Sequence, residues 1–171
     1  MKTSFKIWAI LAVLIIAVGV GACNSLGLNT NNGISNLQET SKPRYTRENL
    51  QITIERTACF GACPTYVFTI YGDGKAIWEG FKNVKAERTD SAIISQVEIQ
   101  RLIDVFEAKK FYDLNDRYHS DMVTDLPSTT ITFFKEGRRK KVYSYFGAPK
   151  EFSEVALAVD QIAVEKGWLE R

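Results

Sequence analysis

The chain has 171 residues, of which 22 are Lys or Arg and 20 are Asp or Glu. Lys2 and Lys6 lie in an N-terminal segment, residues 1–22, that carries no acidic residue. Without this segment the basic and acidic residues balance at 20 each. A balanced charge excludes a global field that would steer the protein to nucleic acid or to an anionic surface, so we expect no nucleic-acid partner.

The N-terminal segment is typical of a secretion signal. The two lysines precede an uncharged apolar run at residues 7–20, which is too short to span a bilayer comfortably, and small residues follow. The sequence VGAC at residues 20–23 resembles a bacterial lipobox. That resemblance implies that residues 1–22 are a lipoprotein signal peptide, cleaved before Cys23, and that Cys23 carries a diacylglycerol thioether and an acylated amine. The alternative is an uncleaved membrane helix that ends in Cys.

The lipid chains would anchor the protein to the bacterial cell envelope. Asn24 rather than Asp follows Cys23, and this pattern favours the periplasmic face of the outer membrane. Residues 23–49 are rich in Asn, Ser, Thr and Gly without a period, which predicts a flexible tether. Residues 50–171 are long enough for one domain with its own core.

Four strands are predicted in the first half of this domain. Apolar residues alternate with polar ones at residues 50–56, and residues 65–71 are β-branched and aromatic. Asp73-Gly74 then predicts a tight hairpin into a strand at residues 75–80. A fourth strand is predicted at residues 83–90.

Two helices and a second hairpin are predicted in the other half. Ser95 and Glu98 have the spacing of a capping box, and Ile99, Leu102, Ile103 and Phe106 follow as one buried stripe. Residues 115–128 form a polar loop, and the strands at 128–134 and 140–146 turn at Glu136-Gly137. Pro149 suits the first turn of a last helix, which Gly167 ends before Trp168 folds back onto the core. The order ββββ-α-ββ-α predicts an α+β domain, a single antiparallel sheet backed by two helices.

Cys59 and Cys63 are the two cysteines that remain for the domain. In an oxidising compartment an even number of cysteines predicts a disulfide, which would close the turn between the first two strands. CxxxCP also resembles the ligand motif of the Sco copper-delivery proteins, with His119 as the candidate third ligand. A strand rather than a helix follows Pro64, which disfavours that alternative. Thiol–disulfide catalysis by the pair and two free thiols are further alternatives.

No residue pattern in the chain points to a catalytic residue or a cofactor. His119 and the nearby Asp113, Asp116, Asp121 and Asp125 lie on a polar loop whose spacing does not match an EF-hand. Whether the protein is an enzyme stays open, and the sequence favours the answer no.

A basic run, Arg138 to Lys141, is expected at the second hairpin tip. We interpret it as a charged tip that discourages edge pairing. The alternatives are contact with an anionic polymer or headgroup, and glycan binding by an exposed row of tyrosines that includes Tyr143 and Tyr145.

The segments CFGACPTY, GDG, TDLP and GAP, taken together, resemble a bacterial family of secreted proteins known only as a domain of unknown function. The resemblance covers nearly the whole domain and implies no activity, cofactor or catalytic residue. We therefore expect a lipid-anchored envelope protein that acts as a non-enzymatic binding or structural module, with an unknown protein or glycan partner. The alternative is a copper-handling or redox protein.

Overall fold

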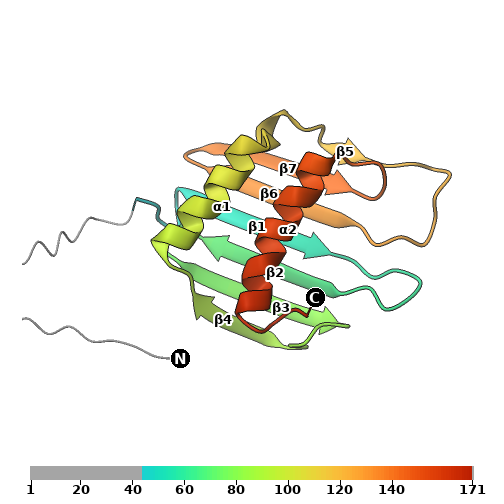
Figure 1. Ribbon diagram of the computed structural model, residues 1–171, viewed down its shortest axis with the longest axis horizontal. Coiled ribbons are helices and arrows are strands. Elements are labelled where there is room, and N and C mark those ends of the chain that lie inside the picture. Colours follow the sequence, from blue (N-terminus) through green and yellow to red (C-terminus); the bar gives the residue numbers. More distant parts are fainter. Residues whose placement is uncertain (1–43, 171) are drawn as a thin grey trace, which may run out of the picture. The chain divides into compact units, whose positions relative to one another are not determined.

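The computed structural model describes residues 44–170, and within them the chain forms one seven-stranded sheet in the order β4-β3-β2-β1-β6-β7-β5. Helices α1 and α2 both cover the same face of this sheet (Figure 1). The elements are β1 Leu50–Arg56, β2 Thr65–Tyr71, β3 Lys75–Lys82, β4 Thr89–Ile93, α1 Gln96–Ala108, the 3₁₀ turn η1 Phe111–Asp113, β5 Arg117–Tyr118, β6 Thr129–Lys135, β7 Arg138–Ser144 and α2 Lys150–Glu165. The α+β class and the ββββ-α-ββ-α order are confirmed.

The sheet differs from the prediction at both of its edges. Strand β5, inside the predicted polar loop, pairs with β7 in parallel, so the sheet is not wholly antiparallel. Strand β4 begins at Thr89 instead of residue 83, because Asn83 has a left-handed φ of 55° and turns the chain. Ala86, in the loop between, is buried, and its carbonyl accepts a hydrogen bond from the Trp78 indole at 2.8 Å.

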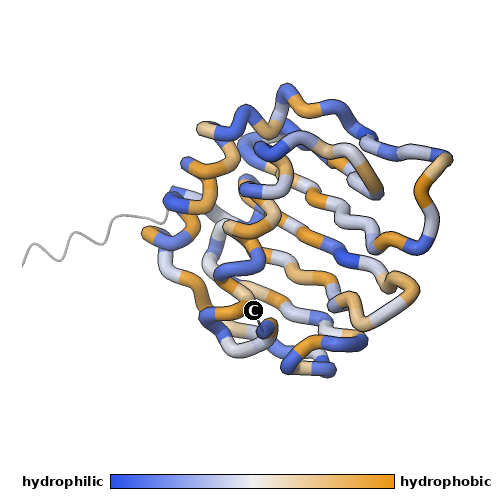
Figure 2. The backbone as a smooth tube through the Cα atoms, turned by 45° about the vertical axis from the view of Figure 1, so that its right-hand side comes forward, coloured by the Kyte–Doolittle hydropathy of each residue, from blue (hydrophilic) through white to orange (hydrophobic). Residues whose placement is uncertain are grey.

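Alternation along the strands divides the sheet into two faces. In β1, Ile52 and Ile54 are fully buried under the helices, and Gln51 and Thr53 lie on the opposite face. Buried and more exposed residues alternate in the same way along β3, and the strands in Figure 2 carry both hydrophobic and hydrophilic residues. Within residues 44–170, no helix covers this second face.

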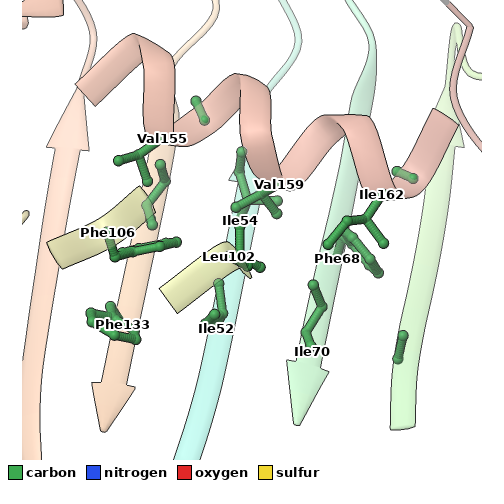
Figure 3. Packing of buried hydrophobic residues seen from close by; sticks show 14 of the residues in the cluster. Ile52, Ile54, Phe68, Ile70, Leu102, Phe106, Phe133, Val155, Val159 and Ile162 are labelled. Carbon is green, nitrogen blue, oxygen red and sulfur yellow. The ribbon is translucent and has the colours of Figure 1, made fainter. Parts of the chain in front are cut away.

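The core fills the space between the sheet and the helices. Figure 3 shows side chains of both layers pointing toward one another, among them Ile52, Ile54, Phe68, Phe133, Leu102, Phe106, Val155 and Val159. Burial of these apolar side chains supplies the main driving force for the fold.

The predicted helix boundaries agree with the structure. The Ser95 hydroxyl accepts a hydrogen bond from the Glu98 amide, and the Ser95 amide donates to the Glu98 carboxylate at 2.9 Å, which completes the capping box. Pro149 is the N-cap of α2, and Gly167 follows the helix with a φ of 74°. Trp168 then packs in the core, stacked on Trp78 at a centroid distance of 5.8 Å.

The packed domain begins before β1. Tyr45 is buried, and its hydroxyl lies 3.3 Å from the Gln100 side chain of α1. The last residues of the segment assigned to the tether therefore belong to the packed domain. The signal segment, Cys23 and the rest of the tether lie outside the described residues. Between residues 44 and 170, neither helix has the length and apolar composition needed to cross a bilayer.

Candidate functional site

A disulfide between Cys59 and Cys63 closes a small ring in the loop between β1 and β2. Their Cα atoms are 5.7 Å apart, and the Cys63 carbonyl accepts a hydrogen bond from the Asn83 side chain at 3.1 Å. Phe60 lies inside the ring with its side chain in solvent. The ring thus presents an aromatic side chain instead of packing it.

The loop at residues 119–127 lies beside the ring. The Phe60 amide donates to the Asp125 carbonyl at 3.4 Å, and Asp125 itself has a φ of 66°. The Leu126 amide donates to the Tyr145 hydroxyl at 3.2 Å. We call the ring and this loop together the loop end of the domain; in Figure 1 both project at the right-hand end of the sheet.

The base of the loop end is held by paired hydrogen bonds between Thr57 and Ser128. The Thr57 amide donates to the Ser128 carbonyl at 3.1 Å, and the Ser128 amide donates to the Thr57 hydroxyl at 2.9 Å. The loop end also gathers three of the four sequence segments of the family resemblance. CFGACP and TDLP touch through Phe60 and Asp125, and GAP joins β7 to α2, whereas GDG turns at the opposite end of the sheet.

The proposed copper ligands are not arranged as a metal site. The sulfurs of Cys59 and Cys63 are bonded to each other, and the His119 imidazole pairs with Asp121 at 2.9 Å. Asp116 pairs instead with Lys140, at 2.6 Å. Within residues 44–170, no group of three His, Cys, Asp or Glu side chains is placed to hold a metal ion.

A largely buried polar cluster lies where β1, β2 and β6 meet the loop end. Arg56, the last residue of β1, donates to Asp160 of α2 at 2.5 Å and to the Tyr66 hydroxyl of β2 at 2.9 Å. Its third nitrogen donates to the Thr129 hydroxyl of β6 at 2.9 Å, and the Tyr66 hydroxyl donates to Asp160. We call these four residues the Arg56 cluster. It ties three strands to α2 where the loops begin.

The electrostatics of the Arg56 cluster oppose proton transfer near neutral pH. Burial, followed by the charge of Asp160, raises the pKa of the Tyr66 hydroxyl far above its usual range. Burial by itself lowers the pKa of Arg56, but the charge of Asp160 and the hydrogen bonds to Asp160 and Tyr66 outweigh it, so that the pKa is raised. Tyr66 therefore stays neutral and Arg56 stays charged, as suits a cluster that holds elements together.

A groove of about 480 Å³ adjoins this cluster, between α2 and the start of β2. Pro64, Leu157 and Gln161 contribute to its walls together with Tyr66 and Asp160. The polar groups of Tyr66 and Asp160 are already bonded to Arg56 or to each other, whereas the Gln161 Oε1 atom has no hydrogen-bond partner among the described residues.

The Arg56 cluster was not predicted from the sequence, although a signal for it is present there. Arg56 continues the buried series Leu50, Ile52, Ile54 at the same two-residue spacing, so its side chain had to point toward the core. A charged residue at such a position requires a partner. The partner, Asp160, is 104 positions away, and no local pattern could identify it.

Comparison with known protein families shows to which family the chain belongs. The family model DUF6438, described as a domain of unknown function, matches residues 50–163, which is more than half of the chain. The chain belongs to the DUF6438 family. This result confirms the expected membership of an uncharacterised domain family. The region matched by DUF6438 includes the ring, the 119–127 loop and Asp160, and it stops before Trp168. No curated protein matches the chain.

The disulfide is expected to be a slow, structural bond. In the full-length protein, intact mass should rise by about two daltons on reduction, rapidly only after denaturation, because Asn83 and Asp125 hold the ring in place. The double variant Cys59→Ser, Cys63→Ser should lower the free energy of unfolding by about 2 kcal/mol, since the closed loop is so short. Urea unfolding measures this change.

A redox role would give a different result. Fast reduction of the native protein by a mild dithiol, with no loss of stability in the double serine variant, would contradict the structural assignment.

Proposed function

We propose that this protein is a lipid-anchored binding module of the bacterial cell envelope. It is held to the membrane through Cys23 and binds a protein partner through its loop end. The proposal is for binding, because the reactive groups at this end are engaged with each other: His119 with Asp121, and Tyr66 with Asp160 and Arg56.

The exposure of Phe60 is the observation that carries this proposal. Its side chain is 93% exposed, although it lies in a ring that a disulfide and two hydrogen bonds hold in place. An exposed aromatic side chain adds nothing to folding stability, whereas a buried one would add roughly 1.5–3 kcal/mol. Fixing it in advance lowers the entropy lost when a partner covers it.

Other exposed apolar side chains lie on the loops at this end of the sheet. Met122 is 94% exposed, and Leu126 and Phe146, on adjoining loops, are also exposed. Aromatic residues and methionine are enriched in the cores of protein interfaces, where a few such anchors supply most of the binding energy. We call Phe60, Met122 and Leu126 the apolar tip.

A protein partner suits the apolar tip better than a bilayer does. Asp121 and Asp125 lie among its residues, and their negative charge would be repelled by anionic lipid headgroups. The described chain also starts at the other end of β1, so the apolar tip and the first described residues lie at opposite ends of the sheet (Figure 1).

The predicted lipobox supports attachment through Cys23, and its sequence context favours the periplasmic face of the outer membrane. Copper handling is less well supported, because it needs Cys59 and Cys63 as thiolates beside His119.

Site-specific photo-crosslinking tests the apolar tip. A photoreactive phenylalanine analogue at position 60 should yield one discrete protein adduct in cells, because the side chain would sit at the centre of the interface. The same analogue at Val97, which is exposed on α1 at the opposite end of the sheet, is the matched control and should yield none. Equal adducts from both positions, or adducts with lipid from position 60, would refute a protein partner.

The anchor has its own test. The variant Cys23→Ser should lose incorporation of labelled palmitate, while a Cys59→Ser, Cys63→Ser variant should keep it. Undiminished labelling of the Cys23→Ser protein would contradict lipid anchoring through Cys23.

A further inference from the structure

The basic run Arg138 to Lys141 lies in strand β7 and not at a hairpin tip. Strand β7 begins at Arg138, which is in register with Lys135 of β6, so the tip consists of Glu136 and Gly137 alone. Alternation along β7 then separates the run onto the two faces of the sheet. The four basic side chains therefore have different surroundings on the two faces.

The two residues on the helix side are engaged within the protein. Lys140 lies opposite the buried Phe133 and pairs with Asp116 at 2.6 Å. The Arg138 guanidinium lies over the Tyr112 ring, 3.9 Å from its centroid. These two cations are thus satisfied by the fold.

The residues on the other side form a row of free charges. Arg139 and Lys141 lie opposite Phe134 and Thr132 of β6, on the face that no helix covers, and Arg117 of β5 is in register with Tyr143. Among residues 44–170, none of these three cations forms an ion pair. They line an open groove of about 610 Å³, whose one acid, Asp116, is already paired with Lys140.

Aromatic rings hold the two arginines in place. The Arg117 guanidinium lies 4.9 Å from the centroid of Tyr143, and the Arg139 guanidinium lies 5.2 Å from that of Phe134. Such stacking restrains the side chain but leaves the edge of the guanidinium free to donate hydrogen bonds to an anion. Successive positions on one face of a strand are about 7 Å apart, so the cations form a spaced row.

We propose that this groove binds an acidic polysaccharide. A spaced row of cations matches a chain that carries a carboxylate or phosphate at regular intervals, and the groove is too open to enclose a small anion. The hydroxyl of Thr132 lies on the same face and offers a hydrogen bond to a sugar hydroxyl. Glu55 of β1, opposite Thr130, bounds the basic surface on its inner side and confines an anionic chain to β6 and β7.

A glycan fits these contacts better than a single-stranded nucleic acid. Nucleic-acid grooves of this kind offer bare aromatic faces on which bases stack. Here the rings of Tyr143 and Phe134 are covered by arginines. The choice of a glycan also rests on the proposed envelope location, where such polymers are accessible.

Binding to fluorescein-labelled polygalacturonate tests the inference. The full-length protein in detergent should bind it in an anisotropy titration, with an affinity that falls as salt is added. The variant Arg117→Gln, Arg139→Gln, Lys141→Gln should bind about tenfold more weakly, since it loses three charge contacts of modest strength. The charge-preserving variant Arg117→Lys, Arg139→Lys, Lys141→Arg should retain most of the affinity.

The matched control removes three other exposed lysines: Lys75→Gln, Lys82→Gln, Lys85→Gln. It has the same net charge as the test variant and should bind within about twofold of wild type. Absent binding, an equal loss in the control, or equal affinity for a labelled single-stranded DNA of similar charge would overturn the proposal. The experiment uses neither the anchor nor the apolar tip, so its failure is distinct from failure of the crosslinking at position 60.

Discussion

The loop end of this domain depends on the charge of Arg56. The guanidinium joins the ends of β1, β2 and β6 to α2 through its bonds to Tyr66, Thr129 and Asp160. Only 23% of the Arg56 side chain and 14% of the Asp160 side chain are exposed, so both charges have given up most of their hydration. Such a pair is seldom a net gain in stability over apolar residues. The ion pair instead fixes the relative positions of the strands and α2, because each Arg56 donor has one acceptor within reach.

That geometry explains how a small loop can remain ordered without a core of its own. The Thr57–Ser128 hydrogen bonds start directly beyond the cluster, and the ring follows two residues later. The disulfide limits the ring, the Asp125 carbonyl holds its Phe60 amide, and Phe60 is left in solvent. These contacts form a continuous series from the packed sheet to the apolar tip. The position of the tip therefore depends on the Arg56 cluster.

Local patterns in the sequence predicted most of the fold. The alternation in residues 50–56, the Ser95–Glu98 spacing and Gly167 each have a local physical cause that the chain carries within a few residues. The errors arose where the cause is distant. Strand β5 has two residues and exists because β7 is beside it. Strand β4 starts late because Asn83 turns the chain and the Ala86 carbonyl in the loop that follows accepts a hydrogen bond from Trp78. The Arg56 cluster depends on a partner 104 positions away. The basic run Arg138 to Lys141 is visible in the sequence, but its predicted place at a hairpin tip was wrong. Only the register of β7 shows that its charges lie on the two opposite faces of the sheet.

Hydrogen exchange at the loop end tests the role of Arg56 most directly. The variant Arg56→Met, Asp160→Leu, Tyr66→Phe replaces the cluster with apolar groups of similar size, so we expect the free energy of unfolding to change little. The amides of Thr57, Phe60 and Ser128 should nevertheless exchange at least about tenfold faster than in wild type, while those of β1 and β2 stay protected. Unchanged protection of these three amides in the folded variant would contradict the claim that the cluster orders the loop end.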